Sequence, residues 1–374
     1  MPQGHLIIAS GGTGGHFYPT LAIAKAYIAA GYGNVTLLVS GKHAAAQLDI
    51  ARQNGLPAQE VEAVRLPTSF LEMLCFPFRF LKCYFRARAK LRQLGGDTLL
   101  GMGSFAAVPA CMAWPYRKKP LFLHEGNAYM GRANRLFAGR ARAIALSLPL
   151  QDGAQLRGAY SLVTGMPLRK AVLEAAEEEV TDGMRAEILS GFGLQPSRRT
   201  VLVFGGSQGA AAINRLLLGV LSLLSPADKE QLQFIVLTGT PANESMQRAF
   251  AQYGIPARIV ASDPDIQKCY QAAGLVVCRA GASSICELAL YGKPMVLIPL
   301  PTAADDHQSC NAATLAAAGA AVMLPQREAT PERFKGLLED WLAKPDRWKD
   351  YGDNARKFAH PEAAEAVATL IAET

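Results

Sequence analysis

Two glycine-rich segments hold the backbone groups of this 374-residue chain that are best suited to binding an anion. The first reads GGTGGH at residues 11–16 and the second reads GGSQG at residues 205–209, and each follows a short apolar run. Glycines let a backbone approach a phosphate closely, and the free N–H groups at the start of a helix attract negative charge. One such loop can be no more than a tight turn, but two of them favour a phosphate-binding function.

A third segment places a carboxylate near a helix start. Residues 279–287 read RAGASSICE, so Gly281 and Ala282 are expected to open a helix, with Glu287 more than one turn inside it. A carboxylate there can accept two hydrogen bonds from a ribose diol while the helix N–H groups meet phosphate. A solvated glutamate on a helix is the plainer alternative, and the residues alone leave both open.

A polar loop is expected after the next strand. Residues 299–311 read PLPTAADDHQSCN and offer donors and acceptors that suit sugar hydroxyl groups. Parallel α/β sheets bind ligands at the carboxyl ends of their strands, where this loop is expected to lie. A surface loop that meets only water is the alternative.

Other nucleotide-binding patterns fit less well. Neither glycine loop matches G-x-G-x-x-G, because Phe17 stands where the first loop would need its last glycine. The looser form does occur at residues 101–106, with Glu125 at about the distance of ~20 residues that the dinucleotide pattern requires. That glutamate falls in a polar cluster, HEGN at residues 124–127, and no Walker pattern is present. A dinucleotide oxidoreductase and a P-loop nucleotidase are therefore disfavoured.

The elements that must position these segments alternate along the chain. In the first half, strands are predicted at residues 5–10, 35–39, 98–100 and 121–123, and a helix at 19–30. The second half begins again with a strand at 200–204 and a helix at 210–224. Its further predicted strands are residues 234–237, 258–260, 275–278, 295–298 and 321–324. Such alternation predicts an α/β fold of two Rossmann-like domains with parallel sheets.

The seam between the domains is predicted between Gly165 and Arg199, a stretch that holds an acidic run. We expect a first domain at residues 1–164 and a second at 165–357. Three helices are predicted to close the chain, at residues 331–343, 347–358 and 361–372. The last of them, within about 358–374, is expected to pack back on the first domain.

The net charge and the distribution of apolar residues limit which partners are expected. Lys and Arg number 38 against 31 Asp and Glu, and the net charge of +7 suits anionic partners. Aromatic and aliphatic residues stand beside cations at residues 70–92, where only Glu72 is acidic, and this combination suits an anionic bilayer surface. A core helix with a solvated basic face is the alternative. No motif for RNA or DNA accompanies the charge, so nucleic acid is not an expected partner.

The sequence shows no clear membrane-spanning segment, signal peptide or metal-binding motif. No apolar run reaches the ~20 residues that span a bilayer, and the amino terminus does not read as a signal peptide. The seven cysteines form no zinc pattern and fit a reduced cytosol. The D-x-D of Asp263 and Asp265 encloses Pro264, so we interpret it as a turn.

Five blocks, in order along the chain, together resemble the MurG-type enzymes of glycosyltransferase family 28. They are GGTGGH with Pro19, Leu21 and Ala22; Gly101, Met102 and Gly103; HEGN with Asn134; GGSQGA at 205–210 with Asn214; and 279–287 continuing through His307, Gln308, Asn311 and Ala312. The resemblance runs over nearly the whole chain and implies a GT-B fold, whose two domains face each other across a cleft. It implies inverting transfer of N-acetylglucosamine from UDP-GlcNAc to the 4-hydroxyl of lipid I, undecaprenyl-diphospho-MurNAc-pentapeptide. The product would be lipid II of peptidoglycan synthesis.

The resemblance also implies site residues. The contacts implied for UDP-GlcNAc are Thr13, Gly14, Gly15, Asn127, Arg169, Ser207, Gln208, Ala282, Ser283, Glu287, His307 and Gln308. Those implied for the acceptor diphosphate are Gly12, Gly14, Gly15, Gly103 and Ser104. Glu287 would hold the ribose, Ser207 and the N–H groups of Gly206 and Gly209 the phosphates, and Asn127 would also help to place the acceptor.

His16 is the expected general base, because imidazole accepts protons near neutral pH. Glu125 is the alternative base, and a structural cap of the first loop is the other explanation for His16. Helix N-termini and Arg169 would stabilise the leaving diphosphate, so no metal or cofactor is expected.

Three positions depart from the family pattern. Gly126 stands in place of Gln, Met166 in place of Asn, and Ser283 where a larger or Thr-like residue is frequent. Other functions stay open: another GT-B lipid glycosyltransferase, a UDP-sugar epimerase, or a nucleotide-sugar binder without activity. For the transferase we expect a peripheral enzyme on the cytoplasmic face of the cell membrane, with UDP-GlcNAc, lipid I, anionic lipid through residues 70–92 and cell-wall synthesis proteins as partners.

Overall fold

The chain folds into two compact units. A computed structural model describes residues 4–11, 14–62, 69–241 and 244–374, with the backbone alone at 207–210. Unit 1 comprises Met1–Arg169 and His360–Thr374, and unit 2 comprises Lys170–Ala359. The boundary between the units therefore follows Arg169, rather than residue 164, and the chain returns to unit 1 at His360.

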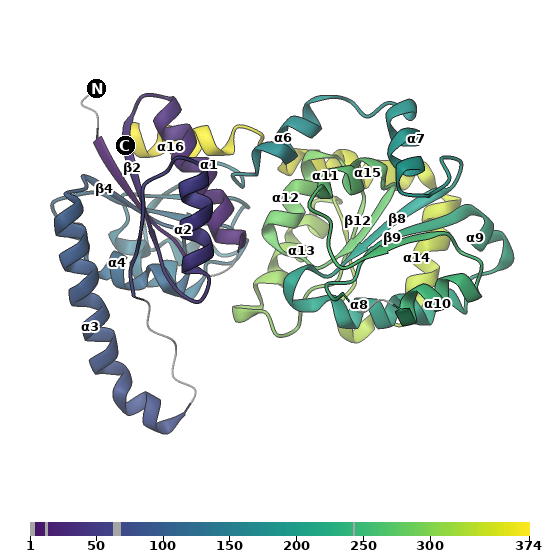
Figure 1. Cartoon of the computed structure of the whole chain (residues 1–374), viewed down its shortest axis with the longest axis horizontal. Coiled ribbons are helices and arrows are strands. Elements are labelled where there is room, and N and C mark those ends of the chain that lie inside the picture. The colour runs from purple at the N-terminus through teal and green to yellow at the C-terminus, as the bar shows by residue number, and fades with distance from the viewer. Residues whose placement is uncertain (1–3, 12–13, 63–68, 242–243) are drawn as a thin grey trace. The chain divides into compact units, whose positions relative to one another are not determined.

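Unit 1 is built on a parallel sheet whose strand order is β3-β2-β1-β4-β5-β6-β7 (Figure 1). The strands are β1 Gly4–Ala9, β2 Gly33–Val39, β3 Ala58–Glu60, β4 Thr98–Gly101, β5 Leu121–Glu125, β6 Ala143–Leu146 and β7 Tyr160–Val163. The order reverses between β1 and β4, where Ala9 pairs with Gly101. Ligands bind beyond the carboxyl ends of strands at such a switch point.

Helices cover both faces of this sheet. They are α1 Gly14–Ala29, α2 Ala44–Gln53, α3 Phe70–Leu94, α4 Val108–Ala113, α5 Arg132–Phe137 and α16 Ala363–Glu373. Alternate residues of β1 enter different cores: Leu6 and Ile8 pack with α1, whereas Ile7 packs with α3 and α4. A strand buried on both faces must be apolar throughout, which is why β1 was evident as a continuous apolar run.

The helix α16 belongs to unit 1 although it follows unit 2 in sequence. Ala364, Val367, Ala368 and Ile371 share one helical face, and all four join the core formed by α1 and the sheet. Figure 1 shows α16, in yellow, beside α1. The spacing of its apolar residues therefore fits a helix that completes the core of unit 1.

Unit 2 repeats the arrangement with six strands in the order β10-β9-β8-β11-β12-β13, all parallel. The strands are β8 Arg199–Phe204, β9 Leu232–Leu237, β10 Ala257–Val260, β11 Leu275–Cys278, β12 Met295–Leu297 and β13 Val322–Met323. The switch point lies between β8 and β11, where Phe204 pairs with Cys278. The loops that follow these two strands are therefore neighbours.

The helices of unit 2 surround this sheet. They are α6 Lys170–Glu177, α7 Asp182–Gly191, α8 Gly206–Leu221, α9 Pro226–Gln231, α10 Glu244–Gln252, α11 Ile266–Ala272, α12 Ala282–Leu290, α13 His307–Ala317, α14 Pro331–Ala343 and α15 Pro345–Ala355. The predictions of β11 and α14 are confirmed to the residue. Two helix starts were predicted too late, because α1 begins at Gly14 and α8 at Gly206, directly after their loops.

Candidate functional site

The first glycine loop begins at a position that only glycine can occupy. A Cβ atom on Gly11 would lie 2.5 Å from the Cβ of Ala106 and 2.6 Å from the carbonyl oxygen of Ser40. The Ser40 hydroxyl donates to the Ala106 carbonyl over 3.0 Å, which ties together the loops after β2 and β4. Gly11 thus brings the loop after β1 against these two loops. Gly12 and Thr13 lie outside the described residues.

The next predicted site residues form the first turn of α1. Gly14 and Gly15 are exposed, and His16 is half-buried. The His16 carbonyl accepts hydrogen bonds from the Thr20 hydroxyl at 2.8 Å and from the Ser10 hydroxyl at 3.5 Å. The leading N–H groups of a helix have no acceptor within it, so this turn is suited to an anion.

The loop after β4 supplies a second glycine that cannot be replaced. Gly103 has a φ of +79°, and a Cβ atom there would lie 2.7 Å from Nδ2 of Asn134 and 3.2 Å from the His124 carbonyl. The neighbouring Ser104 hydroxyl is buried and has no hydrogen-bond partner within the described part of the chain. A buried hydroxyl is normally satisfied, so this one is suited to a ligand oxygen or to water.

Glu125, at the end of β5, organises the next loop. Its Oε1 accepts from the backbone N–H of Asn127 at 3.0 Å, and its Oε2 from the N–H of Gly131 and from Nδ2 of Asn134, both at 2.9 Å. Burial raises the pKa of the Glu125 carboxyl, while these hydrogen bonds oppose the rise. A carboxylate engaged in this way fixes the loop at residues 126–131, which favours a positioning function over proton transfer.

Beneath this loop lies a buried histidine. The Nε2 of His124 lies 3.1 Å from the Ser147 hydroxyl, which in turn donates to the sulfur of Met166 over 3.6 Å. Burial, with a smaller effect of nearby His16, lowers the pKa of His124 to about 3, so the ring is neutral at physiological pH. A Cβ atom on Gly126 would lie 3.2 Å from the Met166 methyl. Two of the three departures from the family pattern are therefore in contact.

Arg169 ends unit 1 beside the first helix. Its guanidinium lies over the ring of Tyr18, 5.6 Å from the ring centre, and a Cβ atom on Gly14 would lie 3.3 Å from the same ring. Cation–π contacts of this kind help to hold an arginine in place. Arg169 is thus located at the glycine-loop end of α1.

In unit 2, the second glycine loop leads directly into α8. Gly206 has a φ of +64° and open space where a side chain would begin. Ser207 and Gln208 follow in the first turn of the helix. The side chain of Asn214 donates to the Thr238 carbonyl over 3.0 Å, which fastens α8 to the carboxyl end of β9.

A buried arginine gathers the loops at the same edge of the sheet. The Nη1 of Arg279 donates to the carbonyls of Ile298 and Pro299, both at 3.1 Å, and its Nη2 donates to Oε1 of Gln326 at 2.8 Å. Burial lowers the pKa of its guanidinium. The fully buried Asn311 donates to the Ala280 carbonyl over 3.0 Å. Together these bonds join the loops after β11, β12 and β13.

Glu287 lies in α12, as predicted, but it is buried. Its Oε2 accepts a hydrogen bond of 2.7 Å from the hydroxyl of Tyr270, a residue of α11. The Tyr270 ring packs on Tyr291 at 5.5 Å. Ala282, also buried, opens the helix and half-buried Ser283 follows it. Tyr270 is a partner of the predicted site that the sequence did not indicate.

The polar loop after β12 is held by its own side chains. Gln308 accepts from the N–H of Leu300 at 3.0 Å, and Nδ1 of His307 lies 2.7 Å from the Ala304 carbonyl. Asp305 and Asp306 have φ values of 52° and 54°, which residues other than glycine rarely adopt. Such strain persists only where the surrounding structure fixes it, and it is frequent at ligand sites.

The predicted residues thus form two groups, one in each unit. In unit 1 those that the structure describes follow β1, β4, β5 and, for Arg169, β7, and in unit 2 they follow β8, β11 and β12. Asn134, Arg279 and Tyr270 complete these groups, and only Asn134 and Arg279 stood in blocks that the sequence marked. The Asp263 segment is confirmed as a turn, in which the Asp263 carboxylate pairs with Arg258 at 2.8 Å.

Comparisons with known proteins agree with this arrangement. The model of the glycosyltransferase family 28 N-terminal domain matches residues 6–146, and that of the C-terminal domain matches residues 200–367. A UDP-N-acetylglucosamine--N-acetylmuramyl-(pentapeptide) pyrophosphoryl-undecaprenol N-acetylglucosamine transferase of Burkholderia lata is 34% identical, over 99% of this chain and 96% of the relative. The chain belongs to glycosyltransferase family 28. A transferase of the same name from Azotobacter vinelandii is 33% identical, over 99% of this chain and 98% of its own.

Solved structures agree with the family 28 fold. The crystal structure of MurG from Acinetobacter baumannii matches with a TM-score of 0.77 and 27% identity, over the full length of both chains. A UDP-GlcNAc 2-epimerase from Neisseria meningitidis, bound to UDP-GlcNAc, matches with a TM-score of 0.68 at 12% identity, over 98% of this chain and 99% of its own. The second likeness concerns the fold alone. The GT-B prediction, with two Rossmann-like parallel-sheet domains, is confirmed.

Helix α3 presents a further surface of unit 1. Cys83, Ala87 and Leu91 bury its carboxyl-terminal half, whereas the amino-terminal part extends beyond the sheet (Figure 1). Its exposed large apolar residues are Phe70, Leu71, Met73, Leu74, Phe78, Leu81 and Phe85. Within the described ranges, no helix has both the length and the apolar character needed to cross a bilayer.

Proposed function

We propose that this protein transfers N-acetylglucosamine from UDP-GlcNAc to lipid I, with inversion, and so makes lipid II for peptidoglycan synthesis. The observation that carries the proposal is the match, over nearly the full length of both chains, to transferases named for this reaction. The two family 28 domain models fall on the two halves of the chain, and each half has predicted residues beyond the carboxyl ends of the strands at or near the switch point of its sheet.

Unit 2 would hold the donor. The N–H groups at the start of α8 would bind the diphosphate, and those at the start of α12 face the same edge of the sheet. Glu287 would accept hydrogen bonds from the ribose, and Tyr270 fixes the carboxylate for that purpose. Ser207, Gln208, Ala282, Ser283, His307 and Gln308 remain the proposed donor contacts. Arg279 would act as a positioning residue, because it joins the loops that carry them.

Unit 1 would hold the acceptor. The first turn of α1 and the Gly103–Ser104 turn would bind its diphosphate, and the unsatisfied Ser104 hydroxyl supports that assignment. His16 would take the proton from the 4-hydroxyl as that oxygen attacks the anomeric carbon and the bond to UDP breaks. Glu125 would position Asn127 rather than transfer a proton, because its carboxylate already accepts backbone and amide N–H groups.

The departing diphosphate needs positive charge. Helix N-termini and Arg169 would supply it, so we propose that turnover requires no metal ion. Arg169 would contribute from its position over Tyr18. Gly12, Thr13, Gly14 and Gly15 complete the proposed phosphate contacts.

Because the proposed acceptor is a lipid, the protein must contact a membrane to reach it. We propose that α3 binds the anionic surface of the cytoplasmic face of the cell membrane as a peripheral element, with its apolar side chains in the headgroup region. The cations of residues 70–92 would face lipid phosphates. Further partners would be proteins of cell-wall synthesis.

The decisive experiment incubates the chain with UDP-GlcNAc and a lipid I analogue, in buffer containing EDTA, and identifies the products. A β-linked disaccharide on the lipid is expected. Formation of UDP-N-acetylmannosamine without acceptor would instead indicate an epimerase. A strict need for added Mg²⁺ or Mn²⁺ would overturn the proposal that no metal is required.

A further inference from the structure

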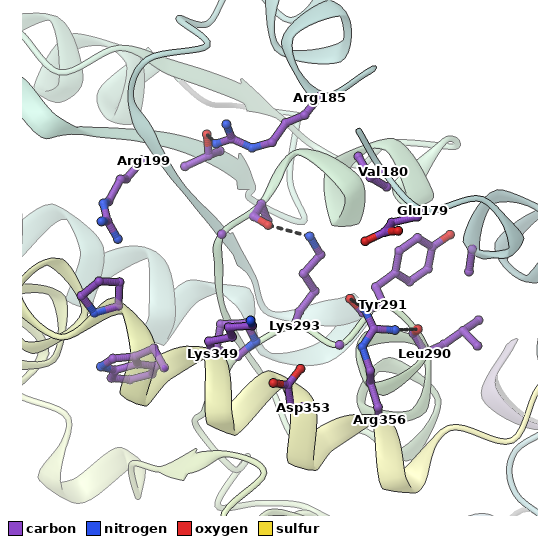
Figure 2. Close-up of a pocket in the computed structure, with 18 of the residues that line it drawn as sticks. Glu179, Val180, Arg185, Arg199, Leu290, Tyr291, Lys293, Lys349, Asp353 and Arg356 are labelled. Carbon is purple, nitrogen blue, oxygen red and sulfur yellow. Dashed lines mark hydrogen bonds between the residues drawn. The ribbon is translucent and has the colours of Figure 1, made fainter. Parts of the chain in front are cut away.

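Unit 2 contains a cavity that the proposed reaction does not use. It has a volume of about 880 Å³ and lies at the amino-terminal edge of the sheet (Figure 2). Thr200 at the start of β8, Gly274 just before β11 and Pro294 just before β12 line it. The proposed donor groups follow the carboxyl ends of these strands. The cavity is therefore a separate site at the opposite edge of the same sheet.

Besides Arg199 and Lys349, three cations from different elements line this cavity and lie near one another. They are Arg185 of α7, Lys293 of the turn after α12, and Arg356, which follows α15. Figure 2 shows the Lys293 ammonium between the two guanidinium groups. Burial, followed by the charges of Arg185 and Arg356, lowers the pKa of Lys293 to about 8, which reflects the proximity of all three.

The partners of these cations are neutral. Lys293 donates to the Ala273 carbonyl over 2.8 Å, Arg185 to the Ala272 carbonyl over 3.3 Å, and Arg356 to the Leu290 carbonyl over 3.3 Å. Among the residues with described side chains, none of the three cations forms an ion pair with a carboxylate. Arg185 also donates to the carbonyls of Pro196 and Arg198 and to the Thr200 hydroxyl, each over 3.4 Å, so its bonds are near the outer limit for a hydrogen bond.

Capping of helix ends accounts for only part of this charge. The carbonyls belong to the carboxyl ends of α11 and α12, and each helix end carries roughly half a negative charge. Two ends therefore offset about one of three positive charges. Four carboxylates also line the cavity, and they are exposed, as Arg356 is, so solvent screens their charge: Glu177, Glu178, Glu179 and Asp353. The charges of Arg185 and Arg356 contribute, after burial, to the lowered pKa of Lys293, so positive charge is concentrated around its ammonium, which suits an anion.

We infer that this cavity binds an oxyanion of the phosphate class between Arg185, Lys293 and Arg356. Guanidinium groups bind phosphate oxygens through paired N–H donors, and the ammonium adds a point charge. The cavity is larger than a phosphate ion, so it also admits the organic part of a phosphomonoester. Such a group can come from a free phosphorylated metabolite or from a lipid headgroup.

The test uses isothermal titration of the full chain, saturated with UDP so that the donor site is filled. The probes are inorganic phosphate and glycerol 3-phosphate, a soluble headgroup. The variants are Lys293→Met and Arg356→Met, with Arg248→Met as the matched control, because Arg248 is an exposed cation of α10 outside the cavity. The quantity compared is the dissociation constant of each probe for each variant, not the total heat of binding.

We expect both cavity variants to weaken binding at least tenfold and the control to leave it unchanged. Tighter binding of glycerol 3-phosphate than of phosphate would indicate that the cavity also contacts the organic part of a phosphomonoester, and equal binding that it takes the phosphate group alone. Lys293 also binds backbone carbonyls, so Lys293→Met could fail to fold. In that case the result for Arg356→Met, at an exposed position, tests the inference. Anion affinity that Arg356→Met leaves intact, or that Arg248→Met weakens equally, would overturn the inference. Neither result bears on the transferase reaction.

Discussion

Two buried glutamates of this protein are held in different ways. Glu125 accepts N–H groups from its own loop and from Asn134, whereas Glu287 accepts the hydroxyl of Tyr270 from a neighbouring helix. The first arrangement fixes a loop. The second orients one carboxylate oxygen at the sheet edge where a nucleotide is proposed to bind.

The assignment of Glu287 can be tested without removing its bulk. Glu287→Gln keeps the shape of the side chain but loses the charge, and we expect UDP affinity to fall by about 1.5–3 kcal/mol, the range for hydrogen bonds to a charged group. Calorimetric titration with UDP measures this change. The matched comparison is Tyr270→Phe, which removes the bond that orients Glu287 but keeps the carboxylate, so it should lower UDP affinity by less than Glu287→Gln does. UDP affinity equal to that of the unaltered protein in Glu287→Gln would remove the ribose assignment.

His124 predicts an acid-sensitive stability. Its pKa is about 3 when folded against 6.5 for an ordinary histidine, so the unfolded chain binds the extra proton. The stabilisation of the neutral form is complete above pH 6.5 and is lost as the pH falls toward 3. Between pH 7 and pH 5 this group should lower the free energy of unfolding by about 2 kcal/mol.

Urea denaturation of the chain and of His124→Gln at both pH values measures this effect. The variant should lose about 2 kcal/mol less than the unaltered protein over the same range. An identical pH dependence in both proteins would show that His124 is not the group responsible.

At the scale of elements, close packing of loops makes one glycine necessary. Gly11→Ala would place a Cβ atom against Ala106 and Ser40 backbone, so we expect destabilisation of more than about 2 kcal/mol. The control is Gly183→Ala in α7, where the nearest atom is the Thr181 hydroxyl at 3.8 Å. It should stabilise by about 0.5–1 kcal/mol. Thermal unfolding of both variants gives the comparison, and equal effects would contradict the packing argument.

Helix α3 makes a second prediction at this scale. Neutralising Arg79, Lys82 and Arg86 to Gln should weaken binding to phosphatidylglycerol vesicles about 100-fold, since each cation near such a surface contributes about 1 kcal/mol. Vesicle sedimentation measures the partition.

A control triple variant neutralises three cations of unit 2, Arg327, Arg333 and Lys335. It has the same net charge as the α3 variant but leaves the helix intact. If it lost as much vesicle binding, the overall charge rather than α3 would explain the effect.

The sequence predicted elements well where apolar residues are continuous or regularly spaced, as in β11 and α14. It missed β6, although all four residues of that strand are buried. β7 was not predicted, since Tyr160 and Val163 are exposed on an edge strand and show no alternation. The start of α1 was placed too late because Pro19 is usually a first-turn residue, whereas here it lies in the second turn.

Within the site, residue types were predictable but their partners were not. The carboxylates and glycines stood in recognisable patterns. The links made by Arg279 to Gln326, and by Tyr270 to Glu287, join segments distant in sequence. Only the fold brings such groups together, so no local spacing could indicate them.

At the scale of the whole molecule, unit 1 depends on a segment that follows unit 2. Removing residues 360–374 would uncover the core face that Val367, Ala368 and Ile371 close. We expect faster hydrogen exchange in β1, β2 and α1, with exchange in β8 and β9 unchanged. Mass spectrometry of peptides from each unit measures this. Uniform acceleration in both units would contradict separate cores.

The position of α16 also affects the order in which the two units can fold during synthesis on the ribosome. The strands of unit 1 emerge first, yet the helix that seals one of their faces is translated only after all of unit 2. At ~5–20 residues per second, that face waits on the order of ten to forty seconds for its cover. Unit 2, a continuous stretch of chain, can reach its final form sooner than the unit that precedes it.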